Sequence, residues 1–144
     1  MGREIKFRGQ RKDNGKWVYG DLIHGVNHKQ GKFFILPIRG GVIGLGDGID
    51  PIDGYEVIPE SVGQFIGMED CNGKEIYEGD IISVNGEHEK IVRYIDDQYG
   101  FCVANISDLK NSEWMYIWQR PAQNWWNDFK GGIKIIGNIY ANKE

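Results

Sequence analysis

The stretch "CNGKEIYEGDII", Cys71–Ile82, decides the fold, because it combines a tight turn, a short strand and a second glycine break. Asn72-Gly73 predicts a type I′ hairpin turn, since both residue types tolerate positive φ. Gly79 predicts a sharp bend or a β-bulge before "IIS" begins the next strand. Turns and short strands in such close succession are typical of an antiparallel β fold.

The acidic residues of this stretch have two interpretations. A strand would place Glu78 and Asp80 on one face, where two carboxylates can form a catalytic pair. However, no histidine or nucleophile lies near them in the sequence. Asp80 is also well placed to accept a hydrogen bond from the nearby backbone. We therefore interpret both carboxylates as structural.

The same pattern continues in both directions along the chain. Asn14-Gly15 predicts a type I′ hairpin, and "FFILPI", Phe33–Ile38, reads as a buried strand. Residues 39–54 read as a long glycine-rich loop with a short strand at Val42–Leu45, and Pro121–Lys130 is the best helix candidate. The sequence predicts a mainly β fold, a small antiparallel barrel or sandwich with one short helix, and an SH3-like barrel element in the C-terminal half.

Length and composition fit one soluble domain. The 144 residues are expected to form a single domain, 1–144, with N-terminal hairpins and a loop over 1–60 and a barrel-like region over 61–144. No apolar run reaches the roughly 18 residues of a membrane span. The charged N-terminus resembles no signal peptide. We therefore expect the protein in the cytoplasm.

A longer segment around the opening stretch resembles a known family. "VIPESVGQFIGMEDCNGKEIYEGDII", Val57–Ile82, is similar to the signature of the YopX family, small proteins of phages and prophages. The start, "REIKFRGQRKDNGKWVYGDLI", and the end, "IIGNIY", are similar too. The resemblance implies an all-β fold and a phage-derived protein in a bacterial host cell. It implies no activity and no catalytic residue, and Cys71 departs from the family pattern.

Candidate metal, cofactor and catalytic sites are weak throughout. His24 and His28, with Asp21 nearby, lie in a hairpin turn rather than on a helix, so helical ligand spacing does not apply. Asp47, Asp50 and Asp53 lack the rhythm of a calcium loop and suit turns. No phosphate-binding glycine motif or nucleophile motif occurs. We predict no metal, no cofactor and no enzyme activity.

The two cysteines do not form a recognisable motif. Cys71 and Cys102 are isolated and belong to no Cys-x-x-Cys pair. They allow one disulfide, but they exclude a disulfide framework and a zinc site built from thiolates. We expect two reduced thiols.

Charge and aromatic residues provide the remaining signals. The net charge is −4, yet basic residues dominate up to Lys16 and acidic residues dominate from Asp47 to Lys90. Four tryptophans crowd the C-terminal region, either as core or as an exposed patch. They are Trp114, Trp118, Trp125 and Trp126. The candidate partner-binding residues are Arg8, Arg11, Lys12 and Trp126.

These observations favour a non-catalytic phage or prophage accessory protein. We expect it to act by binding a protein partner, which includes self-association as a homo-oligomer. The alternative is a β-barrel module that binds single-stranded nucleic acid on aromatics beside a basic groove. A pI near 5.4 weakens that alternative. No membrane association is expected.

Overall fold

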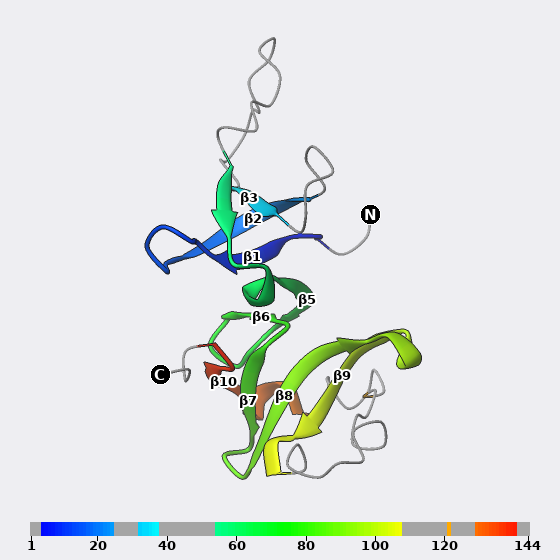
Figure 1. The fold of residues 1–144 in the computed structure, drawn as a ribbon. Helices are drawn as coiled ribbons and strands as arrows, with labels where there is room; N and C mark the ends of the chain where they lie inside the picture. Colours follow the sequence, from blue (N-terminus) through cyan, green and yellow to red (C-terminus); the bar gives the residue numbers. More distant parts are fainter. Residues whose placement is uncertain (1–3, 25–31, 38–53, 108–120, 122–128, 141–144) are drawn as a thin grey trace. The chain divides into compact units, whose positions relative to one another are not determined.

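The fold is mainly β, as the sequence predicts, and its strands pair antiparallel in all the ladders described here. The computed structural model describes residues 4–24, 32–37, 54–107, 121 and 129–140 (Figure 1). The chain divides into two compact units, Met1–Phe65 and Ile66–Glu144, and the division falls inside one strand. Within the described residues, no helix is long and apolar enough to span a bilayer.

The N-terminal unit is a curled antiparallel sheet. Its strands are β1 (Phe7–Gln10), β2 (Trp17–His24), β3 (Phe33–Pro37), β4 (Tyr55–Val57) and the first residues of β5 (Gly63–Glu69). They pair in the order β4-β3-β2-β1-β5. The free edge of β4 also meets the far end of β1, where Arg11 pairs with Val57 and the Lys12 N–H donates to the Glu56 carbonyl (3.0 Å). The sheet therefore curls towards a barrel.

The concave face of this sheet holds the core of the unit. Val18, Ile35 and Val57 are buried there. Because side chains alternate between the two faces of a strand, partly buried side chains on the same face pack against these three. These are Phe7, Leu22, Phe33 and Val62. Gly20 allows β2 and β3 to approach closely, because a Cβ at that position would collide with the backbone carbonyl of Leu36.

The C-terminal unit contains a second antiparallel sheet. Its strands are β7 (Asp80–Val84), β8 (His88–Ile95), β9 (Gly100–Asn105) and β10 (Ile133–Asn138), in the order β10-β7-β8-β9. The end of β5 and β6 (Glu75–Tyr77) come before it along the chain. The described part of this unit includes the 3-10 turns η4 (Asp96–Gln98) and η7 (Lys130–Gly132).

One apolar cluster joins all the strands of this unit. Its buried members come from β5 to β10, and they are Ile66, Ile76, Ile82, Val84, Val92, Val103 and Ile133. The other face of β8 and β9 is also buried at Ile91, Cys102 and Ala104. Core on both faces explains why the centre of β9, Phe101–Ala104, is apolar without alternation.

The three Asn-Gly pairs form different turns. Asn85 and Gly86 both have positive φ (53° and 74°), as a type I′ turn requires. At Asn72-Gly73 and Asn14-Gly15 only the glycine does, so the prediction of type I′ turns there is wrong. Gly73 (φ 79°) instead ends a turn that begins at Asp70, and the Gly73 N–H donates a hydrogen bond to the Asp70 carbonyl at 3.0 Å. This arrangement is typical of a type I turn followed by a glycine bulge.

Two predicted elements fall wholly or partly on residues that are not described. The short strand at Val42–Leu45 lies entirely outside the described residues. Of the helix predicted over Pro121–Lys130, only the first residue and the last two are described, and Lys130 begins η7.

Candidate interaction surface

Both carboxylates of the opening stretch bind backbone N–H groups. Asp80 is buried (2% exposed), and it accepts a hydrogen bond from the Tyr77 N–H at 2.8 Å. Glu78 accepts one from the Tyr94 N–H at 3.0 Å. Gly79 lies between them with a φ of 91°, a conformation that disfavours any side chain with a Cβ. The structural interpretation of this stretch therefore fits the geometry.

A third carboxylate, Asp70, holds the turn before β6. Its Oδ1 accepts hydrogen bonds from the N–H groups of Asn72 and Lys74, both at 2.9 Å. Its Oδ2 accepts one from the N–H of Ile135 in β10, at 3.1 Å. Burial alone raises the pKa of this carboxyl, but the three backbone hydrogen bonds outweigh it, so the pKa lies below its usual value.

The basic candidates of the N-terminal unit are engaged within that unit. Arg8 is buried (5% exposed), and its guanidinium lies 4.6 Å from the centre of the Trp17 ring. Arg11 lies 4.0 Å from the centre of the Tyr55 ring. Its Nε and Nη2 donate to Asp13 at 2.9 and 2.5 Å.

Arg11, which is partly exposed, and Lys12, which is exposed, are both paired with carboxylates. The hydrogen bond from Arg11 lowers the pKa of the Asp13 carboxyl. Lys12 pairs with Glu56 at 2.8 Å, and this hydrogen bond lowers the pKa of the Glu56 carboxyl. Arg11 and Lys12 therefore present less positive charge to a partner than the sequence suggests.

These candidates do not form one surface. Gly9 faces the core residue Val57, so its neighbour Arg8 points to the opposite face of the sheet. Arg11, two residues after Gly9, forms an antiparallel backbone bridge with Val57 and so lies on the core side. The fourth candidate, Trp126, lies outside the described residues, as do Trp114, Trp118 and Trp125.

No metal site is found within the described part of the chain, where no three His, Cys, Asp or Glu side chains gather. His28, Asp47, Asp50 and Asp53 lie outside that part. Cys71 is exposed and Cys102 is buried, and both are free thiols.

One hollow of about 420 Å³ lies beside the β7–β8 turn. It and its neighbour share His88, Glu87 and Asn105, and the neighbour adds Ser107. Among these described side chains, no hydrogen bond joins His88 to Ser107 or to a glutamate.

The end of the β8–β9 hairpin is the surface that sequence reasoning missed. β7 pairs with β8 only from His88 to Ile91, whereas β9 pairs with β8 as far as Ile95. The distal end of the β8–β9 hairpin therefore extends beyond the part that pairs with β7. At this point Glu78 takes the place of a strand partner by accepting the Tyr94 N–H.

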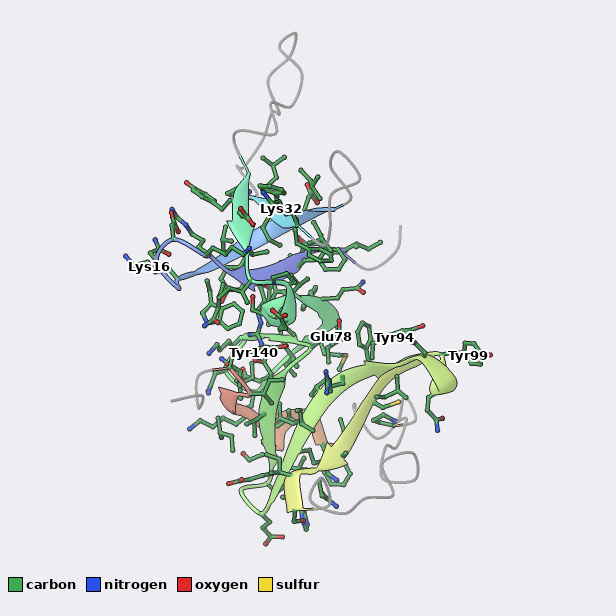
Figure 2. All side chains as sticks on the ribbon, viewed as in Figure 1. Lys16, Lys32, Glu78, Tyr94, Tyr99 and Tyr140 are labelled. Carbon is green, nitrogen blue, oxygen red and sulfur yellow. The ribbon has the colours of Figure 1, made fainter. Side chains whose placement is uncertain are left out.

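The extended end of the hairpin exposes aromatic side chains, and we call residues 94–101 the arm. Tyr99 is 80% exposed and Tyr94 is 44% exposed. Figure 2 shows Tyr99 projecting from the end of the arm. Tyr94 packs edge to face on Phe101, with ring centres 5.5 Å apart. The arm also carries the exposed carboxylate of Asp96.

The backbone of Tyr99 is left-handed (φ 54°, ψ 39°), and its N–H donates to the Asp96 carbonyl at 3.1 Å. Only Asn85 shares a positive φ among the described residues other than glycine. The sequence signal was the segment "DDQYG", a turn-forming cluster with tyrosine where glycine or asparagine is usual.

Comparisons with known proteins agree with this fold. A family model described as "YopX protein" matches residues 6–144. No curated protein matches the chain. Among solved structures, the crystal structure of protein EF1440 from Enterococcus faecalis is similar, with a TM-score of 0.55 and 19% identity over 98% of this chain and 96% of that chain. At that identity the similarity shows the fold alone.

Proposed function

The chain belongs to the YopX family, and we propose that it is a non-catalytic accessory protein that binds a protein partner through the arm. In this proposal it is a phage or prophage protein that acts in the cytoplasm of the bacterial host. The observation that carries the proposal is Tyr99, a large aromatic side chain that is both exposed and held in a left-handed backbone.

The conformation of Tyr99 opposes folding. A left-handed backbone costs a residue with a Cβ about 1 kcal/mol. Burial of the ring does not offset this cost, because 80% of the residue is exposed. Local strain at an exposed position is typical of functional sites, where the free energy of binding a partner compensates for it. Tyrosine is also enriched among the residues that dominate binding energy at protein interfaces.

The charge near the arm favours a protein over a nucleic acid. The carboxylates of Asp96 and Glu78 lie on or beside the arm, and they would repel phosphates. Arg11 and Lys12 lie beside the exposed Tyr55, but each is paired with a carboxylate. We therefore argue for a protein partner and leave binding of an oligonucleotide as a contrary outcome.

The test replaces Tyr99 with asparagine. The Tyr99→Asn variant would keep the left-handed backbone, because asparagine tolerates positive φ, so it should fold at least as well as the wild type. The matched control is Ile136→Thr, which removes an exposed apolar side chain (47% exposed) from β10 of the same unit. Partners are captured on the tagged full-length chain, purified, and titrated calorimetrically against all three proteins.

We expect Tyr99→Asn to weaken the affinity for the purified partner about tenfold or more, as loss of an interface hot spot does. The Ile136→Thr control should bind like the wild type. Equal affinity of the wild type and Tyr99→Asn would overturn the proposal. So would a wild-type chain that binds oligonucleotides but no protein.

A further inference from the structure

We infer that the partner of the arm is a second copy of this chain, and this inference rests on the function proposed above. In a pair of copies, the arm of each protomer contacts the N-terminal unit of the other. The argument draws on the charges of the two units, the lysines that the N-terminal unit exposes, and the way this chain already stacks cations on aromatic rings.

The two units carry opposite formal charge. Met1–Phe65 has nine Lys and Arg against eight Asp and Glu, a net charge of +1. Ile66–Glu144 has eight Lys and Arg against thirteen Asp and Glu, a net charge of −5. Complementary charges steer two surfaces together and set their orientation. A second copy of the chain carries an N-terminal unit whose positive charge complements the carboxylate of the arm.

The N-terminal unit presents two exposed lysines at labelled positions. Lys16 and Lys32 are exposed, and within the described residues neither forms an ion pair (Figure 2). The charge of Lys32 does act on Glu56, and it helps to lower the pKa of that carboxyl. Among the described residues, the other exposed cation of the unit, Lys12, is paired directly with Glu56. Lys16 and Lys32 are therefore the described cations that can meet the carboxylate of Asp96 on another copy.

The contact also has a precedent within the chain. Among its described residues, three cations of the N-terminal unit lie over aromatic rings: Lys6 over Phe65 at 4.9 Å, Arg8 over Trp17 at 4.6 Å and Arg11 over Tyr55 at 4.0 Å. Tyr94 and Tyr99 expose rings of the same kind beside carboxylates. A lysine that reaches the arm gains both an ion pair and a cation–π contact.

We take the exchange to be reciprocal. Each protomer offers one arm and one N-terminal unit, and a pair of copies that exchanges both contacts around a two-fold axis is a closed dimer. The expected species is a dimer.

The test measures the oligomeric state of the full-length chain by sedimentation velocity over a range of concentrations. We expect a monomer–dimer equilibrium that weakens when salt rises from about 50 to about 500 mM, since exposed charges are screened over a shorter distance. Asp96→Lys, the double variant Lys16→Glu with Lys32→Glu, and Tyr99→Asn should each weaken dimerisation about tenfold or more. Combining Asp96→Lys with the two lysine reversals should restore it.

The matched control is Glu87→Lys with Glu89→Lys, which reverses two exposed charges, one on the β7–β8 turn and one at the start of β8, and should leave the dimer intact. Circular dichroism spectra confirm that each variant is folded. A wild-type chain that stays monomeric, yet binds another purified protein through Tyr99, would overturn this inference and sustain the proposed function. A dimer insensitive to Tyr99→Asn and to both charge reversals would overturn the inference, because the arm would not form the interface.

Discussion

Asp70 connects the β5–β6 turn to β10, and its removal should be among the most damaging single changes in the C-terminal unit. The residue is buried (4% exposed), and its carboxylate accepts three backbone N–H bonds. One of them comes from Ile135, which is 65 residues away in the sequence. The side chain therefore stabilises both a local turn and a long-range contact.

The magnitude follows from the groups left without a partner. Asp70→Ala removes the acceptor of three N–H groups, and each lost bond costs about 1 kcal/mol, so the free energy of unfolding should fall by about 3 kcal/mol. Asp70→Asn retains Oδ1 but turns an amide donor towards the Ile135 N–H, so it should cost about 1–2 kcal/mol. Urea unfolding followed by circular dichroism measures both values.

The matched control is Glu69→Ala, which removes the exposed neighbouring carboxylate. It should change the free energy of unfolding by less than about 0.5 kcal/mol. If Asp70→Ala were no more destabilising than Glu69→Ala, the role assigned to the three hydrogen bonds would be wrong.

The pH dependence gives a second check on Asp70. Its pKa is lower in the folded chain than in the unfolded chain, so its stabilising contribution is complete above the unfolded value of about 3.9. The contribution is lost as the pH falls through the lower, folded pKa. The stability difference between the wild type and Asp70→Ala should thus stay constant near neutrality and narrow in acid. A difference that persists unchanged at a pH of about 2 would contradict this account.

Three further changes test the backbone of each unit. Gly20→Ala should destabilise the N-terminal unit by more than about 2 kcal/mol, because its Cβ would collide with the Leu36 carbonyl, whereas Gly137→Ala, with open space around it, should be tolerated in the same thermal melts. Gly79→Val should cost about 1 kcal/mol or more in urea unfolding, since φ is 91° there, and a neutral outcome would exclude a strained turn. Glu78→Gln keeps an oxygen for the Tyr94 N–H, so its melting temperature should shift only slightly, and complete loss of partner binding in the folded variant would show that the carboxylate is functional.

The turns show how much of the structure can be predicted from the local sequence. The sequence predicted type I′ turns at Asn72-Gly73 and Asn14-Gly15, because glycine and asparagine permit a left-handed backbone. Neither pair has positive φ at both residues, whereas Asn85-Gly86 does. At Asn72-Gly73 the buried carboxylate of Asp70 captures two N–H groups of the turn and also binds Ile135 in β10. That third bond is long-range, and local propensity does not encode it.

The candidate partner-binding residues show what the local sequence does not predict. Arg8, Arg11 and Lys12 are close in sequence and were predicted as candidate partner-binding residues together with Trp126. In the fold, strand alternation separates Arg8 from Arg11, and Asp13 and Glu56 pair with Arg11 and Lys12. Tyr99, which sequence reasoning did not select, becomes a candidate only through its exposure and its left-handed backbone.

The amino-acid sequence was enough to predict the mainly β class, the positions of turns and membership of the YopX family. These depend on the pattern of apolar residues and on which residues tolerate a turn, and both are local properties. The folded structure was needed to show which charges are paired, which carboxylates hold backbone N–H groups, and which aromatic side chain faces solvent. Each of these depends on atoms brought together from distant parts of the chain, as Glu78 and Tyr94 are at the base of the arm.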